Sequence, residues 1–109
     1  MPTMEQEIMD FLGKRVFDPA LAAPGAPPHV RRGVLNTRQR IGRLPAVSMV
    51  NYFWSAVAGK TDRAVRMGDY MKAAGLTRFE SDEVLREFKT RFNPDNWSPA
   101  VKRQHMFVK

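Results

Sequence analysis

Apolar residues return every three or four positions along much of this chain, the spacing that places them on one face of an α-helix. The first such segment covers residues 3–12, opens with the capping-box spacing of Thr3 and Gln6, and stops before Gly13. We expect it to form an amphipathic helix within an N-terminal unit of residues 1–17. Its apolar face is formed by Met4, Ile8, Phe11 and Leu12.

The strongest helical pattern begins at Pro45, which suits the first position of a helix because that position needs no backbone N–H donor. The pattern runs to about Ala58, and Gly59 suits the end of a helix. It is apolar around most of its circumference, which predicts the central helix of a core spanning residues 44–92. The residues expected on its buried face are Ala46, Val50, Phe53, Trp54 and Val57.

Two more helices are predicted within this core. Residues 62–74 form the first, and Gly75 suits the left-handed residue that follows many helices. Residues 77–92 form the second, which opens with the capping-box spacing of Thr77 and Glu80. No stretch alternates apolar and polar residues for long enough to predict a strand. We therefore predict an all-α fold with a small three- to four-helix core.

The segments beside this core are predicted to be less regular. Residues 18–33 hold four prolines and two glycines, and each proline removes a backbone donor and disfavours helix before it. We predict that residues 18–43 are a Pro/Arg-rich extended segment, with no more than one helical turn after Gly33, laid as a strap across a partner. Residues 93–109 are predicted to be a basic C-terminal tail with one short helix after Ser98.

Positive charge is concentrated in one part of the chain. The net charge is +7, and residues 19–61 contain no Asp or Glu. This stretch contains a cluster of arginines, whose planar guanidinium pairs bidentately with phosphate or carboxylate. We predict that the cluster binds a partner or phosphate groups; the alternative is a solvated basic linker. Its members are Arg31, Arg32, Arg38, Arg40 and Arg43.

Catalytic and metal-binding patterns are weak. The chain has no cysteine and two histidines, so neither thiolate chemistry nor a metal-ligand cluster is predicted. Residues 59–61 resemble the end of a phosphate-binding P-loop, but Trp54 stands where the motif needs its first glycine and a helix is predicted where it needs a strand. We predict no enzymatic activity, no cofactor and no small-molecule substrate.

A helix-turn-helix DNA reader is also disfavoured. Residues 62–92 supply two helices and a turn, but the start of the second helix carries Glu80, Asp82 and Glu83. Carboxylates at that position repel the phosphate backbone of DNA.

The functional hypothesis follows from the composition. Leu, Ile, Val and Phe make up about 23% of the residues, just above the roughly 20% typical of disordered chains, so the core is expected to be small and to gain from a partner. We predict a non-catalytic accessory or scaffolding subunit of a larger macromolecular assembly, with protein partners. One alternative is a nucleic-acid-binding protein that uses the arginine cluster for phosphate contacts. The other is a peripheral subunit of a membrane complex, with the helix at residues 45–58 against the membrane.

The N-terminal residues bear on the compartment. Glu5, Glu7 and Asp10 precede any basic residue, which is unlike a signal or transit peptide. Together with the absence of cysteine, this predicts an intracellular protein, cytoplasmic or organellar such as mitochondrial, that is not secreted and has no cleavable targeting segment.

Overall fold

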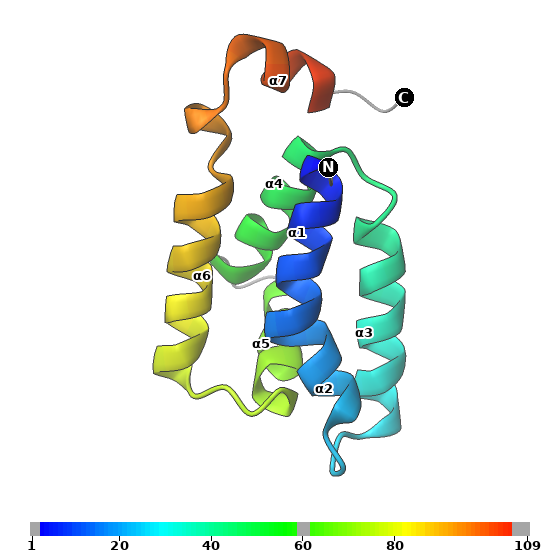
Figure 1. The fold of residues 1–109 in the computed structure, drawn as a ribbon. Coiled ribbons are helices and arrows are strands. Elements are labelled where there is room, and N and C mark those ends of the chain that lie inside the picture. Colours follow the sequence, from blue (N-terminus) through cyan, green and yellow to red (C-terminus); the bar gives the residue numbers. More distant parts are fainter. Residues whose placement is uncertain (1–2, 59–61, 106–109) are drawn as a thin grey trace.

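The structure, a computed structural model, describes residues 3–58 and 62–105, without the side chains of residues 55–58 and 63. Helices account for the regular structure in both ranges, and no strand occurs in either (Figure 1). The all-α prediction is confirmed. The elements are α1 (Met4–Leu12), a π-helical turn η1 (Gly13–Phe17), α2 (Asp18–Ala22), α3 (Pro28–Ile41), α4 (Ala46–Ala58), α5 (Asp62–Ala73), α6 (Arg78–Phe92), a 3₁₀ turn η2 (Pro94–Asn96) and α7 (Pro99–His105).

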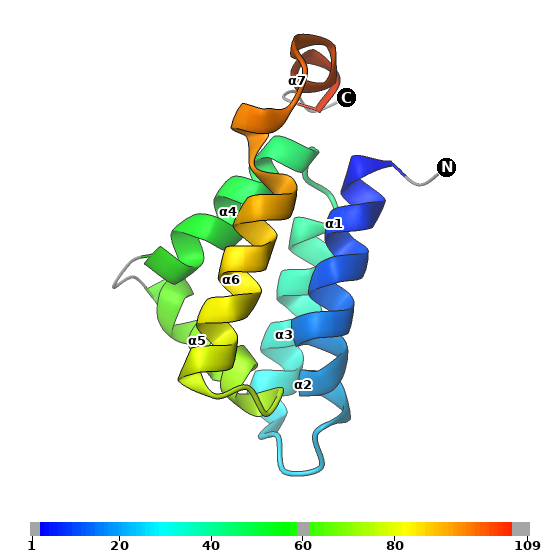
Figure 2. The ribbon, with the colours of Figure 1, turned by 60° about the vertical axis from the view of Figure 1, so that its left-hand side comes forward.

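The helices form a bundle in which α3 and α6 lie on opposite sides in Figure 1, and Figure 2 shows α6 at the front. Between them, α1 packs on α4, and α4 packs on α5. The short helix α7 crosses one end of the bundle, near the start of α1, while the loop between α2 and α3 lies at the other end. As a result, α3 has one side against the bundle and the other facing outwards.

Phenylalanine rings form the centre of the core. The ring of Phe88 on α6 lies 4.7 Å from that of Phe53 on α4 and 5.7 Å from that of Phe11 on α1, measured between centroids. Phe92 adds a ring 5.2 Å from Phe88. Tilted and edge-on pairs at these separations add about 0.5–1.5 kcal/mol each beyond the area they bury. The predicted core residues Val50 and Phe53 are fully buried.

The first helical segment does not end at Gly13. This residue has right-handed helical angles, φ −60° and ψ −53°, and the chain continues through η1 into α2. In η1 the N–H of Asp18 donates to the carbonyl of Gly13, five residues back. The wider turn leads directly into Pro19, which has no N–H to give and whose ring crowds the preceding turn of an ordinary α-helix. Helix α1 ends at Leu12 as predicted, but the expectation that Gly13 ends the helical segment is wrong.

The expectation of an extended segment over residues 18–43 is also wrong, because α2 and α3 occupy most of it. The prolines fall at residues 19, 24, 27 and 28, and none follows until Pro45. Pro28 stands in the first turn of α3, where proline costs nothing. Proline opposes helix on its N-terminal side, so residues 29–41 were free to form one.

The predicted helices at residues 45–58, 62–74 and 77–92 correspond to α4, α5 and α6. Gly75 has the expected left-handed conformation, with φ 84°. Its N–H donates to the carbonyl of Lys72 at 3.0 Å, and the N–H of Leu76 donates to that of Met71 at 3.1 Å, the two bonds of a Schellman ending. The capping box at the start of α6 is present as predicted.

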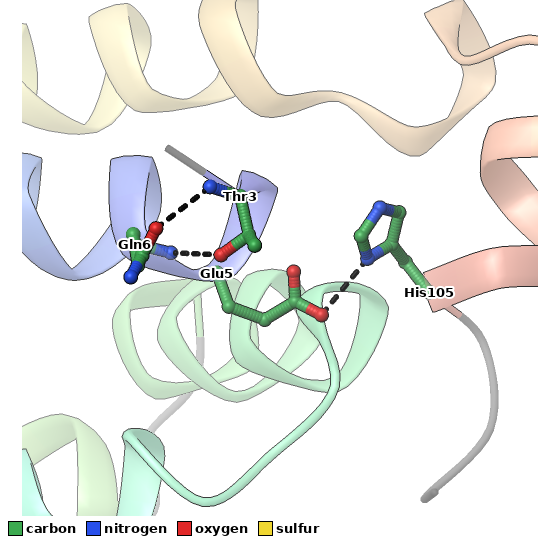
Figure 3. Close-up of polar contacts among 4 residues, drawn as sticks. All are labelled: Thr3, Glu5, Gln6 and His105. Carbon is green, nitrogen blue, oxygen red and sulfur yellow. Dashed lines mark hydrogen bonds and ion pairs between the residues drawn. The ribbon is translucent and has the colours of Figure 1, made fainter. Parts of the chain in front are cut away.

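The C-terminal helix α7 is tied back to the start of α1 (Figure 3). The ring Nδ1 of His105 lies 2.8 Å from Oε1 of Glu5, and the histidine is buried, with 8% of its surface exposed. Beside this contact, Thr3 and Gln6 form the predicted capping box of α1, shown in Figure 3. The short helix expected after Ser98 is confirmed, and it belongs to the bundle rather than to a separate tail.

The chain buries its own apolar surface well. Nineteen apolar side chains from α1 to α6 are buried within the described part. The radius of gyration of 13.8 Å is close to the roughly 13 Å of a compact domain of this length. The packing therefore does not support the expectation that the core gains from a partner.

Helix α3 approaches α5 closely because Gly33 has no side chain. A Cβ built on Gly33 would lie 2.5 Å from the hydroxyl oxygen of Tyr70 and 3.1 Å from its ring. The same hydroxyl lies 3.4 Å from Oγ1 of Thr37 on the next turn of α3. Gly33 thus sets the separation between the two helices.

We predict that Gly33→Ala destabilises the protein by about 1–3 kcal/mol, because the added methyl forces Tyr70 and α3 apart. The matched control is Gly68→Ala in α5, where a Cβ would meet nothing within 4 Å. That change is expected to stabilise by about 0.5–1 kcal/mol, since alanine loses less entropy in a helix. Urea unfolding followed by circular dichroism measures both. Equal stability gains in the two variants would contradict the close approach.

Candidate functional site

The predicted arginine cluster lies on α3 and in the turn that follows it. Helical spacing turns Val30, Val34 and Ile41 towards the bundle, and all three are buried. Side chains on the opposite side of the helix, and Arg43 just beyond its end, are exposed. We call this surface the outer face of α3; it consists of Arg32, Leu35, Asn36, Gln39, Arg40 and Arg43.

Two of the five predicted arginines do not belong to the outer face. Arg38 Nη1 lies 3.0 Å from Oδ1 of Asp18, and Arg31 Nη2 donates to the carbonyl of Ala23 at 3.1 Å. Arg31 and Arg38 are two helical turns apart and lie on the same side of α3. Both contacts join α3 to α2 or to the residue that follows α2, so these two guanidinium groups serve the fold.

The structure leaves the other three arginines available. Arg32, Arg40 and Arg43 are exposed, and their side chains form no ion pair or hydrogen bond with any residue that the structure describes. Each guanidinium offers up to five N–H donors in a fixed plane. No acidic residue occurs on α3, and Asp18, at the start of α2, is paired with Arg38. The outer face is therefore positively charged without compensation on its own helix.

An apolar side chain stands among these charges. Leu35 is 53% exposed, whereas leucine is usually among the most buried residues. Helical spacing places it beside Arg32 and Gln39, three and four residues away. The face thus combines cations, amides and one apolar contact point, a mixture suited to a macromolecular surface.

Two of the carboxylates on α6 have structural roles. The side chain of Glu80 completes the capping box, and Oε2 of Glu87 lies 2.6 Å from Nη1 of Arg15. Within residues 3–58 and 62–105, no three His, Asp or Glu side chains gather closely enough to hold a metal ion.

Residues 59–61, which resemble the end of a P-loop, lie outside the described residues. The segment before them is helical in α4, where that motif has a strand and a glycine-rich loop. No helix in the described ranges is both long and apolar enough to cross a bilayer.

One surface was missed by the sequence analysis: an apolar groove between α5 and α6. Val65, which is 62% exposed, lines this groove and lies off the face predicted to be buried. A valine outside the apolar stripe of its helix was the available signal, but single exposed apolar residues are common on protein surfaces.

Comparison with protein-family models, with curated proteins and with solved structures finds no match to this chain.

The division of the arginines leads to a stability prediction. Arg38→Gln is expected to lower the free energy of unfolding by about 0.5 kcal/mol, because its ion pair with Asp18 is exposed. Combining it with Asp18→Asn should cost less than the sum of the two single changes. Arg40→Gln is the control, and its effect should add to that of Asp18→Asn without coupling. Thermal or urea unfolding of the variants gives the coupling energy, and equal coupling for Arg38 and Arg40 would contradict the division.

Proposed function

We propose that this protein is a non-catalytic accessory subunit of a larger assembly and that it docks the outer face of α3 onto a carboxylate-bearing surface of a neighbouring protein. The observation that carries the proposal is a set of three exposed arginines, Arg32, Arg40 and Arg43, around the exposed Leu35; none of the three pairs with a residue that the structure describes. Carboxylates are the groups that guanidinium pairs with bidentately in proteins.

The residue types favour a protein neighbour. Every cation on the outer face is arginine, although the chain also has lysines elsewhere, for example Lys14, Lys72 and Lys102. Arginine is enriched at protein–protein interfaces and lysine is depleted there, whereas phosphate contacts to nucleic acid use both. Leu35 supplies the apolar contact that such interfaces have at their centre.

The helical form of α3 supports the same proposal. An extended strap would lose conformational freedom on binding, but α3 is already ordered by its buried face and by Gly33. A preformed surface binds with a smaller entropic cost. The docking surface is therefore a rigid helix face, instead of the flexible segment expected from the prolines.

A second candidate function is nucleic-acid binding through the same face. The observation that favours it is that Asn36 and Gln39 accompany the arginines on a helix without carboxylates, since amides and guanidinium groups both bind phosphate and sugar oxygens. The membrane alternative has less support, because Ala46, Val50 and Phe53 of α4 are buried in the core.

The central test removes the three available charges together. Arg32, Arg40 and Arg43 are replaced by Gln, and the control replaces Arg66, Arg86 and Arg103, which are also exposed but lie off α3. Wild type and control should capture the same partners from a native extract of the source cells. We expect the α3 variant to lose these partners. Quantitative mass spectrometry measures the ratio, and a loss of about tenfold or more corresponds to 1.4 kcal/mol of binding free energy. Unchanged capture by the α3 variant would overturn the proposal.

A salt titration distinguishes nucleic-acid binding from binding to a protein neighbour. Fluorescence anisotropy with a single-stranded RNA and a duplex DNA of about 20 nucleotides measures affinity from low to physiological salt. Phosphate contacts release counterions, so binding through three arginines should fall steeply as salt rises. Tight, salt-dependent binding that the α3 variant loses would favour the second candidate over a protein neighbour.

A further inference from the structure

The groove between α5 and α6 is a second open surface, distinct from the outer face of α3. It has a volume of about 740 Å³. Its α5 wall follows one side of that helix over residues 64–72, and its α6 wall follows residues 78–85. At 1.5 Å per residue, each wall is roughly 10–12 Å long, or about two helical turns.

Small residues keep this groove open. A Cβ on Gly68 would meet nothing within 4 Å, so the centre of the α5 wall is empty space instead of a packed side chain. Ser81 is the small residue on the α6 wall. The Schellman turn at Gly75 fixes where α5 ends, and the capping box at Thr77 fixes where α6 begins. Together they set the positions of the two groove walls near this turn.

The interior of the groove is apolar. Met67 and Met71 form its floor and belong to the protein's own core, so the apolar surface open to an occupant comes from Val65, which is exposed, and from Leu76 and Leu85, which are half-buried. Grooves with such apolar walls accept the apolar face of an amphipathic helix. A wall of two turns matches an occupant that presents apolar side chains at positions i, i+3 or i+4, and i+7.

The rim of the groove is net positive. Lys72 and Arg78 are exposed, line the groove, and form no ion pair with any residue in the described ranges. Asp82 is the single carboxylate among the lining residues. An occupant with acidic residues beside its apolar stripe would place carboxylates next to Lys72 and Arg78.

We propose that this groove binds an amphipathic helix of a partner protein, whose apolar stripe enters between α5 and α6 and whose acidic flank pairs with Lys72 and Arg78. This inference does not depend on the α3 proposal, because the two surfaces share no residue. It gives the subunit two docking surfaces on different helices, both selective for acidic partners.

A second copy of the chain suits the groove poorly. Two copies that each carry a net charge of +7 repel one another. Helix α1 is amphipathic and has an acidic first turn, but its Ile8, Phe11 and Leu12 are buried in its own core. It can enter a neighbouring groove only if the bundle opens.

The test uses the full-length protein and fluorescein-labelled helical peptides of about 16 residues. One peptide has Leu and Met at i, i+3, i+4 and i+7 with Glu beside them, a second has Lys in place of Glu, and a third scrambles the first. Fluorescence anisotropy gives the affinities, and amide chemical shifts locate the site. We expect the Glu peptide to bind in the groove about tenfold more tightly than the Lys peptide.

Variants connect this binding to the groove. Gly68→Trp fills the empty wall and is expected to weaken Glu-peptide binding about tenfold, whereas Gly68→Ala should leave it within about twofold. The Lys72→Gln/Arg78→Gln variant should remove the preference for Glu over Lys. Phe79→Gln is the surface control, because it adds no charge and Phe79 is 67% exposed and does not line the groove. Circular dichroism confirms that each variant is folded.

Three outcomes would overturn the proposal: equal binding of all three peptides, unchanged Glu-peptide binding by Gly68→Trp, or shifts located outside the groove. Sedimentation velocity showing a dimer that Gly68→Trp abolishes would assign the groove to a second copy instead. Decanoate shifting the groove amides while no peptide does would assign it to a lipid. The variant that lacks Arg32, Arg40 and Arg43 should bind the Glu peptide like wild type, so failure of one surface is distinguishable from failure of the other.

Discussion

Contacts among four phenylalanine rings connect the main helices of this bundle. Phe88 contacts Phe11, Phe53 and Phe92, so a single cluster joins α1, α4 and α6. The remaining long helices are positioned through these, since α5 packs on α4 and α3 packs on α5. The outer face of α3 and the α5 wall of the groove therefore belong to helices attached to this cluster from outside, whereas the other wall of the groove lies on α6, which contributes Phe88 and Phe92 to the cluster.

Local signals predicted the helices of the core and failed where the chain combines prolines and glycines. The capping box at Thr77 and the turn at Gly75 involve neighbouring residues, so the sequence alone determines them. Gly13 and Gly33 were misinterpreted because the same residue type can end a helix, widen a turn or allow close packing. The choice among these depends on distant residues: Gly33 stands within α3 and leaves space for Tyr70, which is far along the chain.

The candidate site was predicted in composition but not in geometry. A stretch without carboxylates identified five arginines, yet their roles depend on which side of a helix each one occupies. The partners of Arg31 and Arg38 come from residues 18–23, a segment predicted to be extended. An extended segment would not have brought these residues to α3, so the sequence prediction could not separate Arg31 and Arg38 from the other three arginines. The groove between α5 and α6 depends on how the two helices diverge in space, and no local sequence pattern predicts that divergence.

The position of α5 has a thermodynamic consequence. Tyr70 meets Gly33 of α3 on one side of this helix, while Gly68 and Met71 line the groove on another. A ligand that draws α5 towards α6 would act on the contact between Tyr70 and α3, and a ligand that moves α3 would act on α5 through the same contact. Any such effect is reciprocal, because a coupling free energy between two sites is shared equally by their ligands. Helix α5 thus connects the two surfaces through the packing of Tyr70 against Gly33 and its 3.4 Å contact with Thr37.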